Sequence, residues 1–279
     1  MEIIRNRDRR QMTDSLPPIL DINRPLAITI GKFEALHLGH SYLINKSVEY
    51  AGKHNLASAV LSFVPHPIQV LLDRDYKTMF SADEQAFLLE KYGADYWIPF
   101  PFDNKLAEML PEEFCRLLKE QLNCQALLVG EGFHFGRDRT GTQAALQSLG
   151  EKFNIDIITV PTLHLGSNLG NSEKISTSQI REYLIKGQIK EANKLLGRPF
   201  LIMGKINRGV NGYNIYPAAD KLMPPEGQYI TPSGTVKVNT YYNSSGDKAY
   251  MVKIPELDEN IQDEILIVEL IDYCKHNIQ

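Results

Sequence analysis

Hydrophobic residues between positions 26 and 160 follow two alternating patterns. Short apolar runs have the length and the β-branched composition of buried strands, and they span residues 26–31, 57–63, 96–100, 126–130 and 155–160. The segments between them carry apolar residues at helical spacing, as in Phe114, Leu117, Leu118 and Leu122. Near-continuous apolar strands separated by amphipathic helices are typical of a parallel sheet with helices on both faces. The pattern predicts a Rossmann-like α/β domain.

The pattern changes after Pro199. Helical spacing continues over residues 176–186 and 188–196, but residues 200–279 contain short β-rich runs, such as 235–242, between glycines and prolines. Strands separated by Gly/Pro turns predict a small antiparallel β domain. We therefore expect two domains, 1–199 and 200–279. Because a domain as small as the second buries little surface by itself, it should share part of its core with the first.

Composition narrows the possible functions. The chain has 279 residues, 43% of them hydrophobic and 23% charged, which is typical of a globular protein. Thirty basic and 34 acidic residues give a net charge of −4, so neither nucleic acid nor a membrane surface is an expected partner. Three cysteines without C-x-x-C spacing argue against a disulfide framework and a zinc site. With no visible secretory signal and no apolar run of about 20 residues, we expect a cytoplasmic protein. The sequence leaves its oligomeric state open.

The strongest chemical signal lies where the first predicted strand passes into the first helix. His37 and His40 are three residues apart, so their rings project to one side of the first helical turn. Gly31 permits a tight turn before them, and Gly39 leaves the helix surface open. Two imidazoles beside the positive end of a helix suit phosphate oxygens. An isolated pair of histidines is more often a cap and a solvated side chain, but the strand–glycine–helix context favours phosphate binding.

A second cluster occupies residues 175–181. Ser176, Thr177 and Ser178 are natural N-cap residues for the helix that follows, and Arg181 lies one turn further along. The arginine fork can hold a phosphate with two hydrogen bonds. Taken alone, the cluster fits helix capping and a surface arginine equally well. The histidine motif favours phosphate binding.

Together the two motifs resemble those of the HxGH nucleotidyltransferase superfamily, and the bacterial FAD synthetase family within it. Residues 31–40 resemble GxFDGxHxGH, 62–67 resemble FDPHP, 129–136 resemble VGxDFxFG, 175–181 resemble SSTxIR, and 192–199 resemble the linker between the two domains of that family. Members of this family usually combine a riboflavin kinase with an FMN adenylyltransferase.

The resemblance implies transfer of AMP from ATP to FMN, giving FAD and pyrophosphate, with Mg²⁺ bound to the triphosphate and no dedicated metal ligands from the protein. It assigns catalysis to His37, His40 and Arg181. It assigns ATP binding to Gly31, Phe33, Gly39, Ser176, Thr177 and Ser178. It assigns flavin binding to Phe63, His66, Phe133 and Phe135, although aromatic residues at alternate positions belong to a core just as often.

The chain departs from the family pattern at several positions. Glu34 and Ala35 replace Asp and Gly before the histidines, and Val64 and Gly132 replace two further aspartates. The lost carboxylates at Val64 and Gly132 support an alternative, a non-catalytic flavin- or nucleotide-binding regulatory protein of the same fold. The intact histidine motif and Arg181 argue against it, because a pure binding protein would not need both.

The C-terminal part departs further. The kinase motif PTAN reads Pro217-Ala-Ala-Asp220, the preceding loop is shortened, and the chain stops soon after Glu269, which aligns with the kinase base. Residues 200–279 therefore resemble a riboflavin kinase barrel reduced to a structural remnant, and we expect riboflavin kinase activity to be absent.

Overall fold

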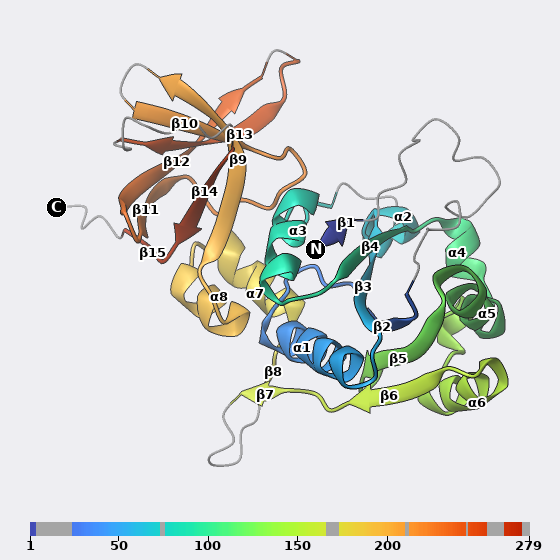
Figure 1. Cartoon of the computed structure of the whole chain (residues 1–279). Helices are drawn as coiled ribbons and strands as arrows, with labels where there is room; N and C mark the ends of the chain where they lie inside the picture. Colours follow the sequence, from blue (N-terminus) through green and yellow to red (C-terminus); the bar gives the residue numbers. More distant parts are fainter. Residues whose placement is uncertain are drawn as a thin grey trace. The chain divides into compact units, whose positions relative to one another are not determined.

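The computed structural model describes residues 1–3, 24–72, 76–165, 173–209, 212–243, 245–255 and 265–274 (Figure 1). The chain forms two compact units that interleave along the sequence. The first comprises Met1–Phe33, Gly39–Tyr76 and Ala86–Lys174, and the second comprises Glu34–Leu38, Lys77–Gln85 and Ile175–Gln279. The second unit thus contains two short N-terminal segments besides the C-terminal part. The domain boundary that we expect between residues 199 and 200 stays a prediction.

The first unit is built on a parallel sheet. Its strands are β1 (Glu2–Ile3), β2 (Leu26–Ile30), β3 (Ala57–Val64), β4 (Tyr96–Pro101), β5 (Cys124–Gly130) and β6 (Asp156–Val160). They pair in the order β1-β4-β3-β2-β5-β6, and each neighbouring pair is parallel. Apart from the edge strand β1, this is the doubly wound order that reverses beside the first long strand. The predicted Rossmann-like α/β fold is confirmed.

Helices cover the two faces of this sheet. The core on one face joins strands β2–β5 to α4 (Asn104–Glu108), α5 (Pro111–Leu122) and α6 (Gln143–Phe153), and Phe114, Leu117, Leu118 and Leu122 of α5 are all buried in it, as their spacing predicts. The strand order reverses at β2, so the right-handed crossovers usual in such sheets put α1 (Leu38–Lys53) on the opposite face. The remaining elements are α2 (Pro67–Leu72), α3 (Ala82–Lys91), the 3₁₀ turn η1 (Arg137–Arg139) and the antiparallel pair β7 (His164–Leu165) and β8 (Glu173–Lys174).

The second unit contains an antiparallel sheet and two helices, α7 (Thr177–Ile185) and α8 (Ile189–Leu196). The strands are β9 (Phe200–Gly209), β10 (Gly212–Pro217), β11 (Gly227–Thr231), β12 (Gly234–Tyr242), β13 (Lys248–Ile254), β14 (Ile265–Leu270) and β15 (Asp272–Tyr273). They pair in the order β14-β9-β10-β13-β12-β11-β15. A single residue, Ile271, joins the two edge strands β14 and β15, so the sheet curls back on itself. We call this sheet the barrel. The predicted antiparallel β region is confirmed.

The three cysteines are free, and Cys115 and Cys124 are buried. Burial raises the pKa of Cys115 to about 11 and that of Cys124 to about 12, so both remain thiols at neutral pH. Within the described residues, no helix is long and apolar enough to cross a membrane.

Candidate functional site

Strand β2 ends at the point where the strand order of the sheet reverses. Its neighbours are β3 and β5, and ligands of open α/β sheets bind outside the carboxyl ends of the strands at such a point. Gly31 follows β2 directly and donates its N–H to Leu61 O at 3.2 Å. A Cβ atom on Gly31 would lie 3.0 Å from the Phe33 ring, so this close approach favours glycine.

Phe33 supports one of the two motif histidines. Its side chain is buried, and its ring meets the His40 ring edge-on, with centroids 5.2 Å apart. His40 lies in the first turn of α1, which contains no acidic residue that would neutralise the positive end of the helix. The structure therefore presents His40 beside a partial positive charge. Because the Phe33 side chain is buried, a contact with nucleotide would come from its backbone.

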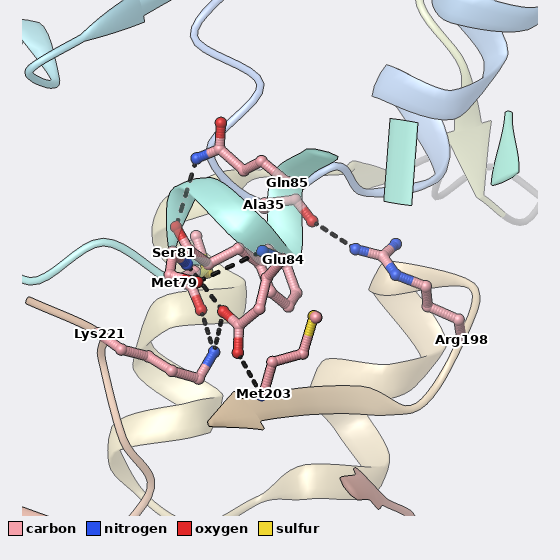
Figure 2. Close-up of polar contacts among 9 residues, drawn as sticks. Ala35, Met79, Ser81, Glu84, Gln85, Arg198, Met203 and Lys221 are labelled. Atoms are coloured by element: carbon pink, nitrogen blue, oxygen red, sulfur yellow. Dashed lines mark hydrogen bonds and ion pairs between the residues drawn. The ribbon is translucent and has the colours of Figure 1, made fainter. Parts of the chain in front are cut away.

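The second motif histidine belongs to the loop Glu34–Leu38 of the second unit, and Arg198 holds that loop. The Arg198 guanidinium donates to Leu36 O at 2.6 Å, and it also lies over the Phe80 ring. Its second backbone partner is Ala35 O at 3.1 Å, which Figure 2 shows. Arg198 thereby fixes the backbone immediately before His37. Sequence reasoning missed this residue, although it stands in the Gly-Arg-Pro segment that carries the linker resemblance.

His37 is neutral at neutral pH. Its side chain is only 7% exposed, and burial, with a smaller contribution from the positive charge of Arg198, lowers its pKa from 6.5 to about 4. A neutral imidazole still donates one hydrogen bond. Negative phosphate charge nearby would raise this pKa, so the ring could also take up a proton as charge develops.

The lowered pKa of His37 predicts an acid-sensitive fold. The folded protein binds fewer protons at His37 than the unfolded chain between pH 4 and 6.5, so the free energy of unfolding should fall as the pH falls through this window. The full shift corresponds to about 3 kcal/mol. We expect His37→Gln to lack this component, so that its stability gains on the wild type between pH 6.5 and 4. Urea unfolding followed by circular dichroism measures the difference, and parallel profiles for the two proteins would contradict it.

Arg181 is held on α7 by two oxygen partners in the second unit. Both terminal nitrogens of its guanidinium donate to Lys77 O, and one lies 3.7 Å from Glu34 Oε1. The ion pair is largely shielded from solvent, since the side chains are 18% and 2% exposed. Glu34, a departure from the family pattern, therefore has its charge balanced by Arg181.

The hydroxyl group at the start of α7 does not cap the helix. Ser176 is the N-cap residue, as its type and position predict, but its side chain makes no capping hydrogen bond. Ser176 and Thr177 are partly exposed, and Ser178 is exposed. The N-terminal N–H groups of this helix are thus not bound by the Ser176 hydroxyl, which suits an anion-binding role.

The predicted flavin residues lie in the first unit. Phe63 is near the end of β3, and Phe133 and Phe135 follow β5; all three are partly buried against the core of the sheet. Phe133 and Phe135 stack on each other with centroids 5.6 Å apart, and His66 stacks on Tyr76. The structure thus places aromatic side chains at the carboxyl ends of β3 and β5, while their contact with flavin stays a prediction.

Metal-binding side chains do not gather in the part of the chain that the structure describes: no group of three or more His, Cys, Asp or Glu residues lies close enough to hold an ion.

Comparisons with known proteins agree with the architecture. The family model described as FAD synthetase matches residues 20–178. A FAD synthetase from Listeria monocytogenes is 32% identical over 77% of this chain and 85% of its own length. A bifunctional riboflavin kinase/FMN adenylyltransferase from the same organism is 28% identical, covering 85% of this chain and 79% of its own. A crystal structure of a macrolide-efflux protein from Streptococcus pneumoniae has a TM-score of 0.70 at 22% identity, over 89% of this chain and 85% of that one, which shows a shared fold.

Proposed function

Because this chain belongs to the FAD synthetase family, we propose that it is an FMN adenylyltransferase, which transfers AMP from ATP to the phosphate of FMN. An oxygen of the FMN phosphate attacks the α-phosphorus of ATP. The bond between that phosphorus and the oxygen bridging to the β-phosphate breaks, so the products are FAD and pyrophosphate. FMN supplies the nucleophile itself, and the protein contributes alignment and charge stabilisation.

The observation that carries this proposal is the loop Glu34–Leu38, which contacts two arginines and contains a neutral histidine. Arg198 fixes the loop backbone, and Arg181 lies beside Glu34. His37 would donate a hydrogen bond to the triphosphate. Its ring would take up a proton as negative charge grows on the departing pyrophosphate. Arg181, Thr177 and Ser178 would bind the β- and γ-phosphates at the start of α7.

Mg²⁺ would neutralise part of the triphosphate charge. Phosphate oxygens and water supply most of the ligands of Mg²⁺ on a nucleotide, so we expect few ligands from the protein. The chain's own task is then to orient the phosphates with N–H and imidazole donors.

The flavin ring would bind at the carboxyl ends of β3 and β5. Phe63, Phe133 and Phe135 supply partly exposed aromatic surface there, and His66 stacks on Tyr76 beside it. An isoalloxazine ring is flat and apolar on its faces, so stacking on aromatic side chains would stabilise it.

Loss of riboflavin kinase activity is the finer part of the proposal. Ala218 and Asp220 stand where the resemblance expects a hydroxyl and an amide beside the metal. Ala219 and Asp220 instead offer backbone oxygens to Lys77 and Thr78, and the neighbouring Lys221 is fully buried. This segment therefore makes contacts within the fold.

We also place the protein in the cytoplasm, where ATP and reduced thiols are available.

The alternative is a non-catalytic flavin- or nucleotide-binding protein. Its support is the chemistry of two positions near the sheet edge: Val64 presents an exposed apolar side chain, and Gly132 has a φ of 76°, a conformation that favours glycine. Both replace aspartates of the family pattern. Under this alternative the protein would bind FMN or ATP without forming FAD.

Two reactions with the full-length protein test the proposal. With FMN, ATP and Mg²⁺, we expect FAD and pyrophosphate to appear in equal amounts, separated by liquid chromatography. With riboflavin in place of FMN, we expect neither FMN nor FAD, and adding FMN to that mixture should restore FAD formation. Binding of FMN without FAD formation would favour the regulatory alternative, and catalytic formation of FMN from riboflavin would contradict the loss of kinase activity.

A further inference from the structure

We infer that the barrel positions Arg181 for phosphate binding, through two short segments of the second unit. The first is residues 77–81, which we call the anchor segment, and the second is residues 218–222, which we call the barrel segment. This inference rests on the proposed role of Arg181 at the triphosphate. It assigns the C-terminal part of the chain a function in adenylyl transfer.

The anchor segment and the barrel segment run side by side. Thr78 and Lys221 form a parallel β-bridge, in which Thr78 N donates to Asp220 O at 2.8 Å and Leu222 N donates to Thr78 O at 2.6 Å. The Lys77 ammonium adds a bond to Ala219 O at 2.7 Å. Two backbone hydrogen bonds of Thr78 and one side-chain hydrogen bond of Lys77 therefore hold the start of the anchor segment against the barrel segment.

One peptide unit transmits this restraint to Arg181. The carbonyl of Lys77 and the N–H of Thr78 belong to the same planar trans peptide, in which they point in opposite directions. The N–H is bound to Asp220 O, and the carbonyl accepts both terminal nitrogens of Arg181. A rotation of this peptide would break both sets of bonds. The barrel segment thus fixes the orientation of the oxygen on which Arg181 rests.

A buried ion pair ties the rest of the anchor segment to the barrel. Lys221 Nζ donates to Glu84 Oε2 at 2.7 Å and to Met79 O at 2.8 Å, and both charged side chains are fully buried (Figure 2). The ammonium also lies over the rings of Phe80 and Phe200. Burial lowers the pKa of Lys221, and the neighbouring Glu84 carboxylate opposes this shift. Breaking such a pair leaves an uncompensated buried charge, so separation of the two segments is costly.

Glu84 also links the anchor segment to the first barrel strand. Its carboxylate accepts from Ser81 N and from Met203 N of β9, each at 2.7 Å, and Ser81 Oγ in turn accepts from Glu84 N. This reciprocal pair is a capping box at the start of α3. These bonds fix the end of the anchor segment against β9. The fixed end in turn restricts where the beginning of the segment, and with it Lys77 O, can lie.

The test is a double-mutant cycle between the barrel contacts and Arg181. Lys77→Met removes the bond to Ala219 O from a partly exposed side chain, so we expect it to fold normally. Lys221→Met removes the bond to Met79 O but leaves Glu84 buried, so we pair it with Glu84→Gln in a double variant. Each is made alone and with Arg181→Ala. The readouts are the dissociation constant for MgATP by calorimetry, and kcat and KM for FAD formation.

We expect Lys77→Met and the Lys221→Met/Glu84→Gln double variant, together the barrel variants, to weaken MgATP binding. The KM for ATP should rise about three- to tenfold, since a misplaced Arg181 guanidinium loses part of its hydrogen-bond energy. With Arg181→Ala already present, the same changes should have less than about twofold effect, because interacting residues are not additive. Val238→Ala, which opens a cavity in β12 away from the anchor segment, is the matched control for barrel stability. It should leave the dissociation constant unchanged.

Other outcomes separate the two proposals. Equal effects with and without Arg181, unchanged ATP binding in both barrel variants, or an equal effect of Val238→Ala would each overturn the positioning role. If the wild type binds MgATP but forms no FAD, the proposed function fails, while the binding cycle still decides whether the barrel acts through Arg181. A wild type that does not bind MgATP would overturn both.

Discussion

Replacing His40 with alanine should lower kcat for FAD formation about 10²–10³-fold, the loss expected when one preorganised donor to a developing charge is removed. His40 lies in the first turn of α1, and the edge-on Phe33 ring supports its imidazole. In the proposed reaction negative charge grows on the departing pyrophosphate, so its interaction with His40 should be stronger in the transition state than in the bound substrate. We therefore expect KM for ATP to change less than about threefold. Steady-state kinetics with FMN in excess measures both constants.

His54→Ala is the matched control for this prediction. His54 follows the other end of α1, where it is exposed and stacks on Tyr50, so its loss should leave kcat within about twofold of the wild type. His40→Gln should keep a side-chain N–H donor and recover part of the rate. Near-wild-type turnover in His40→Ala would exclude His40 from the catalytic step.

Replacing Arg181 with alanine should act mainly on substrate binding and raise KM for ATP about 10- to 100-fold. A hydrogen bond to a charged group contributes about 1.5–3 kcal/mol, which corresponds to this range. The guanidinium is held by Lys77 O and Glu34 before any nucleotide binds, so it needs little reordering to meet a phosphate. Some loss of kcat should accompany the change, because the proposed site also exposes Arg181 to growing charge on the leaving group.

Arg181→Lys tests whether the fork matters beyond its charge. Lysine keeps the positive charge but cannot bind two oxygens in one plane, so we expect a KM between those of the wild type and the alanine variant. Arg116→Ala, on the exposed side of α5, should have no effect. An unchanged KM in Arg181→Ala would place this residue outside the phosphate site.

Much of the fold was predictable because local patterns report local environments. Strands β2 and β5 read as continuous apolar runs, since helices cover both faces of the sheet. The strand–glycine–helix sequence around Gly31 marks the edge at which sheets of this kind bind their ligands. The glycines and prolines after Pro199 predicted an antiparallel region in the same way. These features depend on residues within one element and its turns, so periodicity and residue type suffice to find them.

The candidate phosphate site was predictable only in part. His37, His40 and Arg181 could be named because their motifs pair imidazole and guanidinium groups with helix starts. The protonation state of His37 could not be predicted, because it depends on burial and on the charge of Arg198, which is distant in sequence. A lone arginine in a linker gives no sign of which backbone oxygens it will bind.

The sequence by itself thus determined the parallel sheet, the antiparallel region after Pro199 and the residue types of the candidate phosphate site. Tertiary structure alone decided that residues 34–38 and 77–85 join the second unit, that Lys221 pairs with Glu84, and that Arg181 rests on Lys77 O. The physical reason is that every residue except proline carries the same backbone N–H and C=O groups. A contact made through them therefore leaves no trace in the residue type, and a buried charge reveals its partner only when the chain has folded.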